Sequence, residues 1–197
     1  MFFDGEYRLI GSVSPTALQD VIRAVPELAW MEETGRQEVY AAHRHTQTIP
    51  LIFDPDMRHA EPSIRPRFTE LQPVIQPVMD MIVADFASRS ARQEGRGYFV
   101  RILLARLNAG AKIGSHRDHG FSLARAHRIH CPIFTNPEAE FGIAGNIKHL
   151  APGEVWEINN RKVHGVRNLG AEPRVHLILD YVVPGEIVMD PEGELVA

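Results

Sequence analysis

The chain lacks most of the features that mark secreted and membrane proteins. It has a single cysteine, Cys131, so it cannot form an internal disulfide, and secretion gains no support. No run of apolar residues approaches the length of a membrane span. The opening segment MFFDGEYRLIGSV has no basic region and contains Asp4 and Glu6, unlike a signal peptide. We therefore expect a cytoplasmic protein.

The chain also lacks an excess of basic charge. It has 21 lysines and arginines against 25 aspartates and glutamates, which gives a net charge of −4. Proteins that bind nucleic acids or anionic membranes usually carry a basic excess, so we expect neither partner here. We see no internal repeat and no low-complexity segment. With 197 residues and 44% hydrophobic residues, the chain fits one domain with one sizeable core.

Helical patterns are present in the first half of the chain. Ser14 and Pro15 suit the N-cap and first position of a helix that we expect to run to about Leu28. Apolar residues then recur at steps of three and four from Pro66 to about Ser88, which predicts a long helix. Two prolines lie inside that second pattern, so the helix begins after them or bends there.

The remaining pattern is typical of strands. Residues 46–53 (TQTIPLIF) predict a strand whose Pro50 indicates a sheet edge or a bulge. From Tyr98 onward, short apolar segments alternate with glycine, proline or asparagine, which favours a β-sandwich or barrel. The predicted organisation is one domain: a helix-rich extension over 1–95, a jelly-roll core over 96–185, and a tail over 186–197.

One spacing in this second half points to a metal. His116 and Asp118 are two residues apart, so on a strand their side chains share a face. His164, on a strand folded across the barrel, would complete a set of two histidines and one carboxylate. That ligand set leaves coordination positions open and is typical of non-haem Fe(II) oxygenases. His-x-Asp alone is common, and the alternative is a solvated histidine beside an aspartate in a turn.

Arg174 follows His164 in the sequence and is separated from it by a predicted turn. Residues 163–166 and 174–177 are strand-like, and residues 168–173 between them have turn chemistry. If the two segments pair as a hairpin, Arg174 lies opposite His164 on the same face. An arginine there could bind the distal carboxylate of a dicarboxylate held by the metal. The alternative is an exposed arginine, or an ion pair with Glu172 or Asp180.

Residues 128–133 also form a strand-like segment, with polar side chains on one face and mainly apolar side chains on the other. In RIHCPI, Arg128 and His130 share one face, and Ile129, Cys131 and Ile133 share the other. The first face suits a polar pocket, although a strand with one solvated face fits the pattern equally well. We interpret Cys131 as a small buried residue.

Together these segments resemble a known family. ARLNAGAKIGSHRD, HRIHCPI and KVHGVRN…PRVHLILDYV, with a weaker similarity at HTQTIPL, resemble the aspartyl/asparaginyl β-hydroxylase family of Fe(II)- and 2-oxoglutarate-dependent oxygenases. The resemblance covers roughly residues 98–184, and the superfamily includes bacterial proline hydroxylases. It implies a double-stranded β-helix, or jelly roll, with flanking helices.

The resemblance also implies roles for individual residues. His116 and His164 resemble the two iron-binding histidines, and Arg174 resembles the arginine that binds the distal carboxylate of 2-oxoglutarate. Arg128 and His130 resemble an Arg-x-His pair that contacts the cosubstrate. Where the vertebrate aspartyl hydroxylase has a glycine, this chain has Asp118, as the bacterial proline hydroxylases do. The carboxylate weakens any transfer of the vertebrate substrate and argues against a halogenase.

The expected function is therefore hydroxylation of an amino acid, free or within a peptide. Fe(II), 2-oxoglutarate and O₂ would be required, and succinate and CO₂ would be released. The sequence leaves open a non-oxidative cupin-like metalloenzyme and a jelly-roll module that binds a metabolite. Candidate substrate contacts are the basic residues His43, Arg44, His45, Arg106, His119 and Arg125.

Overall fold

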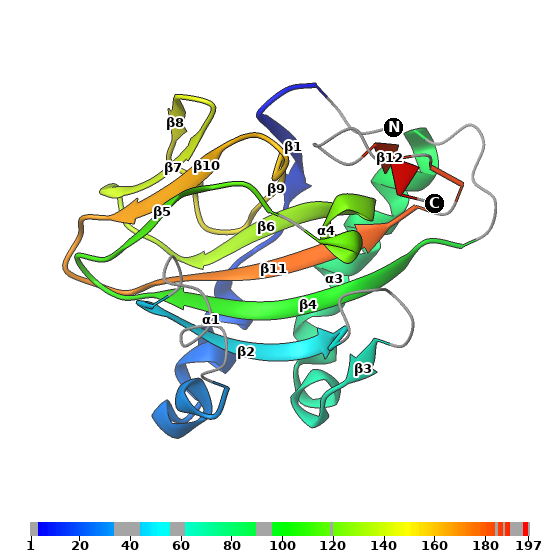
Figure 1. Cartoon of the computed structure of the whole chain (residues 1–197). Helices are drawn as coiled ribbons and strands as arrows, with labels where there is room; N and C mark the ends of the chain where they lie inside the picture. Colours follow the sequence, from blue (N-terminus) through cyan, green and yellow to red (C-terminus); the bar gives the residue numbers. More distant parts are fainter. Residues whose placement is uncertain are drawn as a thin grey trace.

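Two antiparallel sheets lie one above the other in the computed structural model (Figure 1). The structure describes residues 4–33, 44–55, 62–89, 96–118, 120–183, 185–186, 188–189 and 195–196. The larger sheet has the order β1 (Tyr7–Ser12), β9 (Glu154–Ile158), β6 (Ala126–Phe134), β11 (Arg174–Val182), β4 (Tyr98–Leu107), β2 (Thr46–Phe53) and β3 (Ser63–Ile64). The smaller has the order β5 (Lys112–His116), β10 (His164–Asn168), β7 (Ala139–Ile143) and β8 (Asn146–Lys148). The short strands β12 (Val188–Met189) and β13 (Leu195–Val196) pair with each other.

This arrangement confirms the predicted fold class, a mainly β jelly roll with flanking helices. Strands β1 and β2 join the larger sheet beside β9 and β4, so the N-terminal region extends the sheet as well as covering it. That pairing favours a single domain, although the boundaries given above stay a prediction. Among the described residues, no helix is long and apolar enough to cross a membrane.

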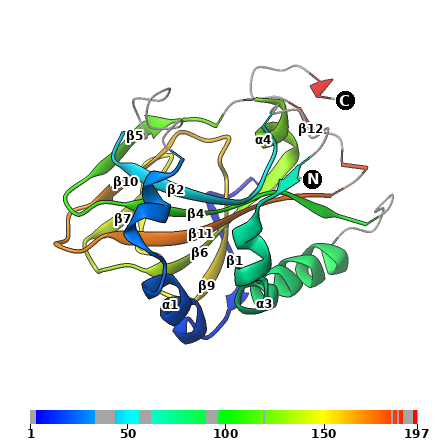
Figure 2. The ribbon, with the colours of Figure 1, turned by 90° about the horizontal axis from the view of Figure 1, so that it is seen from below.

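Helices cover the outer face of the larger sheet. α1 (Thr16–Arg23) and α3 (Pro66–Arg89) lie beneath it, as the view from below shows (Figure 2). A 3₁₀ helix, η1 (Glu27–Met31), packs beside β2, and the short α4 (Phe121–Arg125) leads into β6. The smaller sheet therefore faces the other side of the larger one, away from the helices.

The first helix is shorter than predicted. It ends at Arg23, and its N-cap is Pro15 with no side-chain hydrogen bond, so Ser14 does not cap it. The predicted end near Leu28 was wrong because Pro26 interrupts the chain. Proline has no N–H and disfavours helical backbone in the residue before it, so the chain turns there and restarts as η1.

The prolines in α3 neither delay its start nor end it. The helix begins at Pro66 and includes both Pro73 and Pro77. These two prolines are exposed, so the carbonyls that lose an intrahelical partner lie on the solvent side. The opposite side carries the residues that bury the helix, namely Phe68, Leu71, Ile75, Val78, Ile82 and Phe86.

Strand β2 matches its predicted bounds, Thr46–Phe53, and the bulge expected at Pro50 is confirmed. The register with β4 shifts between Pro50 and Ile52. Because proline cannot donate to a neighbouring strand, a break in the ladder there costs no hydrogen bond.

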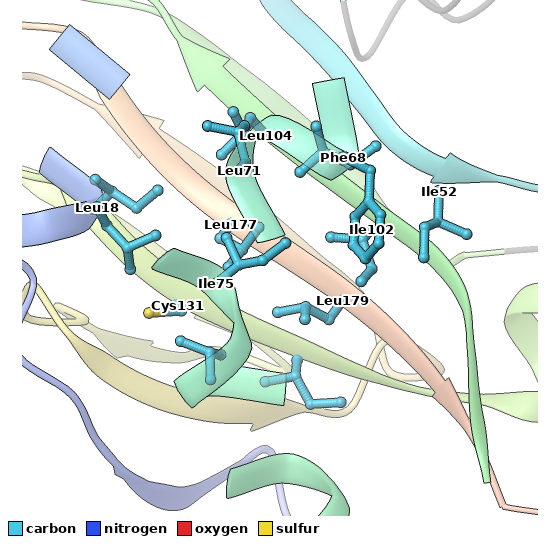
Figure 3. Close-up of a cluster of buried hydrophobic side chains, with 14 of the residues drawn as sticks. Leu18, Ile52, Phe68, Leu71, Ile75, Ile102, Leu104, Cys131, Leu177 and Leu179 are labelled. Carbon is cyan, nitrogen blue, oxygen red and sulfur yellow. The ribbon is translucent and has the colours of Figure 1, made fainter. Parts of the chain in front are cut away.

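The main core lies between α3, α1 and the larger sheet. Figure 3 shows Leu71 and Ile75 of α3 over Leu104 and Leu177, with Leu18 of α1 to one side. On β11, Val175, Leu177, Leu179 and Tyr181 point into this core, because alternate side chains of a strand share one face. Cys131 is fully buried in the same cluster, as interpreted from the sequence. The other faces of β6 and β11 are thereby left to line the space between the two sheets.

Ile82 allows a test of this packing. Its side chain is 0% exposed on the buried side of α3. We expect Ile82→Ala to lower the free energy of unfolding by about 2–5 kcal/mol, since it removes buried methyl groups and leaves a cavity. Urea unfolding measures this. Gln72→Ala, on the exposed side of α3, is the control and should change stability by less than about 0.5 kcal/mol.

A buried ionic cluster ties the C-terminal segment to the outer face of the sheet. His127 on β6 bonds Glu157 through Nδ1 at 2.6 Å and Glu186 through Nε2 at 2.8 Å. Glu157 also accepts a hydrogen bond from Nε of Arg8. The Nη1 and Nη2 atoms of Arg8 donate to the two carboxylate oxygens of Asp85 on α3. Burial lowers the pKa of His127, but Glu157 and Glu186 outweigh it and raise that pKa overall. His127 is therefore charged in the folded protein over a wider pH range than a free histidine.

This cluster predicts a pH-dependent contribution to stability. A histidine whose pKa is raised on folding stabilises the fold fully below its unfolded pKa, about 6.5, and loses this effect as pH rises through the folded value. The stability difference between the native protein and His127→Gln should therefore be largest near pH 6 and shrink towards about pH 9. Urea unfolding at both values measures it. A difference that grows with pH would contradict the charged state assigned to His127.

Candidate metal centre

Three potential ligands converge where the two sheets open to the surface. His116 ends β5, His164 begins β10, and Asp118 lies in the segment after β5. Ligand atoms of the three residues all lie within 4.8 Å of one another. The side chain of His116 is 24% exposed, whereas those of Asp118 and His164 are 9% and 5% exposed. The cluster is thus buried on one side and reachable on the other.

The pairing of β5 with β10 sets the two histidines opposite each other. His164 and His116 are direct partners in that antiparallel pair, and their ring centroids are 4.4 Å apart. Asp118, however, does not share a strand face with His116 as predicted, because β5 ends at His116. The backbone N–H of Asp118 instead donates to the carbonyl of Asn160, in the segment before β10. The irregular segment after β5, not strand alternation, brings the carboxylate to the imidazoles.

Backbone carbonyls orient both imidazoles. Nδ1 of His116 lies 2.8 Å from the carbonyl of Gly114, and Nδ1 of His164 lies 3.0 Å from that of Lys162. With Nδ1 donating, Nε2 of each ring is left as an acceptor. These two atoms lie 3.7 and 3.9 Å from Oδ1 of Asp118. A metal-binding histidine usually donates one ring N–H to a carbonyl in this way and turns its other nitrogen towards the metal.

The protonation states also suit a cation. Burial raises the pKa of Asp118, but Arg128, His164 and His116 outweigh it and lower that pKa to about 2. Burial lowers the pKa of His164. At neutral pH the site therefore holds an ionised carboxylate and a neutral imidazole, which are the forms that bind metals.

Arg128 is engaged by two carboxylates. Its Nε and Nη2 each lie 2.8 Å from one oxygen of Asp180, and its Nη1 bonds Oδ2 of Asp118. Burial lowers the pKa of Arg128, but Asp118 and Asp180 outweigh it and raise that pKa overall. The alternation on β6 therefore placed Arg128 on the inner face, where its Nε and Nη2 both donate to Asp180.

Arg174 reaches the same interior from a different direction than predicted. Strand β10 pairs with β5 and β7, whereas β11 pairs with β4 and β6, so the expected hairpin of the two strands was wrong. Residues 169–173 cross from the smaller sheet to the larger one, and Asn168 secures the crossing by bonding the carbonyls of Leu107, Asn108 and Glu172. Turn chemistry in a sequence does not distinguish a hairpin from such a crossing.

The guanidinium of Arg174 is buried without a carboxylate partner among the described residues. Arg174 is 4% exposed, its Nε donates a hydrogen bond of 2.8 Å to Nε2 of His176, and its Nη2 lies 2.7 Å from Nδ1 of the same ring. Neither Glu172 nor Asp180 pairs with it. Burial lowers its pKa to about 9, so it stays protonated at neutral pH. A buried cation without a counter-charge is costly, so this position is suited to binding an anion.

Two neutral histidines lie beside this arginine. His130 and His176 approach through their Nδ1 atoms at 3.2 Å, and His130 also meets Phe141 of the smaller sheet edge-on at 5.2 Å. Burial and Arg174 lower the pKa of both histidines well below the usual range. They offer hydrogen bonds here without adding charge.

One narrow cavity connects the cluster of ligands to Arg174. Its lining comprises Thr46, Ala105, Leu107, Ile113, His116, Arg128, His130, Phe141, Ile158, His164, Val166, Arg174 and Ile178. A larger hollow of about 610 Å³ lies on the outer face of the smaller sheet, over Gly142 and Gly165. Arg128, His130 and Arg174 do not line that hollow, so we assign the chemistry to the narrow cavity.

The sequence missed several contacts in this interior. Asp180 was considered only as a partner for Arg174, and neither His176 nor Asn160 was given a role. Of the candidate substrate contacts, Arg106 is engaged by Glu27 and Gln47 and stacks over Trp30. His43 and His119 lie outside the described residues. Alternation on β11 does place Asp180 on the inner face, so it was the one signal that could have identified this residue.

Solved structures of other proteins share this fold. An oxidoreductase of the 2OG-Fe(II) oxygenase family from Burkholderia pseudomallei is 14% identical over 87% of this chain and 91% of its own, with a TM-score of 0.57. A viral collagen prolyl hydroxylase from Paramecium bursaria Chlorella virus-1, solved with 2OG, is 10% identical over 91% of this chain and 97% of its own, with a TM-score of 0.60. A non-haem monooxygenase in a nickel complex is 12% identical over 97% of this chain and 80% of its own, with a TM-score of 0.51.

The sequence itself matches a family model. The model, described as aspartyl/asparaginyl beta-hydroxylase, matches residues 82–184, which include β4 to β11 and every residue of the cavity except Thr46. This match spans just over half of the 197 residues. The protein therefore belongs to the aspartyl/asparaginyl β-hydroxylase family, and the enzyme class predicted from its sequence, an oxygenase that hydroxylates its substrate, is confirmed.

Proposed function

We propose that this enzyme hydroxylates an amino acid, free or within a peptide, using Fe(II), 2-oxoglutarate and O₂ and releasing succinate and CO₂. One observation carries the proposal. Two histidines of a cluster that also holds a carboxylate line one cavity with a buried arginine, and this arginine has no carboxylate partner among the described residues. The cluster suits a divalent cation, and the arginine suits the far end of a dicarboxylate.

His116, Asp118 and His164 would hold the iron. Two imidazole nitrogens and one carboxylate would leave coordination positions open for a keto acid and O₂. When bound, the iron supplies the chemistry: oxidation of a C–H bond coupled to oxidative decarboxylation of 2-oxoglutarate. The protein's part is to fix the geometry and to exclude water, and the burial of His164 and Asp118 serves both.

Arg174 would bind the distal carboxylate of 2-oxoglutarate. Its neighbours His130 and His176 are neutral, so the positive charge of Arg174 is the charge that a carboxylate meets at that end of the cavity. Phe141, whose ring lies 5.7 Å from the guanidinium, packs against it without competing for hydrogen bonds. His130 lines the same cavity and suits a hydrogen bond to the cosubstrate. Nη1 of Arg128, the nitrogen beside the ligand cluster, remains our candidate for a further contact.

The substrate would approach from the exposed side of the cluster, where the side chain of His116 is 24% exposed. The family name and the fold shared with a prolyl hydroxylase support an amino-acid substrate, such as an aspartyl, asparaginyl or prolyl group. A cytoplasmic location, inferred from composition, stays a prediction.

Two other functions are tested by the same assay. A non-oxidative cupin-like enzyme or a metabolite-binding module would need no free arginine placed for a dicarboxylate. The purified protein is supplied with Fe(II), ascorbate, 2-oxoglutarate and O₂, and succinate is measured against a panel of amino acids and short peptides. Succinate that rises with one substrate, with a product heavier by one oxygen, supports the hydroxylase. Bound iron without succinate would favour the alternatives.

The metal ligands give a direct prediction. His116→Ala or His164→Ala should abolish tight Fe(II) binding and turnover, because each removes one of three ligands. Iron retained after anaerobic desalting and succinate formation are the two measurements. The control is His149→Ala, an exposed histidine outside the cavity, which should keep both. A His116→Ala protein that retains iron and turnover would remove this residue from the site.

Arg174 gives a second prediction. Arg174→Gln should raise the KM for 2-oxoglutarate about 30-fold or more, since losing one partner of a buried charge pair costs about 2–5 kcal/mol. Succinate formation across a range of 2-oxoglutarate concentrations measures it. The control is Arg167→Gln, on β10 but 53% exposed and paired with Glu140. Equal loss of activity at every concentration would contradict the role of Arg174.

A further inference from the structure

Asp180 is a fully buried carboxylate for which the proposed function has no direct use. It lies on β11, directly opposite Arg128 on β6, and is 0% exposed. Each of its oxygens accepts one hydrogen bond of 2.8 Å from Arg128, through Nε and Nη2. These two hydrogen bonds use Nε and Nη2 of the guanidinium and leave Nη1 for another partner.

That remaining nitrogen reaches the metal cluster. Nη1 of Arg128 bonds Oδ2 of Asp118, while Oδ1 of Asp118 faces the Nε2 atoms of His116 and His164 at 3.7 and 3.9 Å. One oxygen of Asp118 therefore faces the two imidazoles and the other binds the arginine, and the side chain of Asn160 also donates a hydrogen bond to this carboxylate. Asp118 lies beyond the end of β5, so strand pairing does not fix its side chain and these contacts orient it.

Charges alternate along this part of the larger sheet. Asp54 binds Arg101, Arg101 lies opposite Asp180 on the neighbouring strand, and Asp180 binds Arg128. Without the charge of Asp180, the nearest carboxylate to Arg128 is Asp118. A guanidinium that binds a carboxylate through two parallel hydrogen bonds would engage both oxygens of Asp118 and leave neither for a cation.

We propose that Asp180 is a positioning residue: it holds Arg128 so that only Nη1 reaches Asp118, which keeps Oδ1 of Asp118 free to bind a divalent cation beside His116 and His164. The inference rests on the proposed function, because it requires the metal site. It also implies that Asp118 would offer the cation one oxygen while its other oxygen stays bonded to Arg128.

The test measures metal affinity and not turnover. Mn(II), a redox-stable stand-in for Fe(II), is titrated into the metal-free full-length protein, and free Mn(II) is measured by electron paramagnetic resonance. Asp180→Asn should bind Mn(II) about tenfold to a hundredfold more weakly than the native protein, the range seen when support to a metal ligand is lost. Adding Arg128→Gln to Asp180→Asn removes the competing guanidinium and should recover most of the affinity.

A matched control separates positioning from general damage. Glu157 is likewise a buried carboxylate bound by an arginine, but it lies on the outer face of the sheet. Glu157→Gln should lower the melting temperature and keep the Mn(II) affinity. If Asp180→Asn does not fold, Arg128→Lys replaces it, since lysine keeps the charge but cannot bind both carboxylates in a fixed geometry. This variant should also bind Mn(II) more weakly.

The outcomes are distinct. Native affinity in Asp180→Asn, or in Arg128→Lys where that variant replaces it, overturns the proposal, as does a double variant that binds no better than Asp180→Asn. Equal weakening in Glu157→Gln also overturns it, because general destabilisation would then suffice. If the native protein binds Mn(II) no more tightly than His164→Ala, the metal site itself fails, and with it the proposed function.

Discussion

The buried, uncompensated charge of Arg174 is the constraint on which the rest of the site depends. Removing a guanidinium from water costs several kcal/mol unless a counter-charge or hydrogen bonds replace its hydration. In this protein His176 supplies hydrogen bonds, and no carboxylate among the described residues supplies charge. Arg174 lies on a central strand of the larger sheet in spite of this cost in free energy. An anionic ligand that binds the guanidinium would offset the cost.

Arg128, on the neighbouring strand β6, is also buried, but its charge is compensated. It donates two hydrogen bonds to Asp180 and one to Asp118. Around the cavity, the two negative charges of Asp118 and Asp180 balance the two positive charges of Arg128 and Arg174. A divalent cation and a dianionic cosubstrate also sum to zero, so both can enter together without leaving a net buried charge. A divalent cation alone would add two positive charges beside Arg128. Binding of the cation together with the dianionic cosubstrate is therefore favoured.

Sequence reasoning succeeded where a local period decides the outcome. Alternation on β6 correctly divided Arg128 and His130 from Cys131, because a strand has only two faces. It failed where the outcome depends on chain direction over longer distances. The crossing at residues 169–173 looked like a hairpin, and Asp118 looked like part of β5, since turn residues do not reveal which sheet the chain joins next. The prolines of α3 were ambiguous for a related reason: their cost depends on which side of the helix faces solvent.

The two halves of the site come from different sheets, and this links catalytic geometry to the core. The candidate metal ligands belong to β5, β10 and the segment between β5 and α4, whereas Arg174, His130 and Arg128 belong to the larger sheet. The distance between this cluster of ligands and Arg174 is therefore set by how the sheets stack. On β11 the residues that line the cavity alternate with those that pack against α3, such as Leu177 and Leu179. A slip of one residue would exchange the two sets, so core packing on one face fixes the charged groups on the other. The helical cover thus specifies the site as well as stabilising the fold.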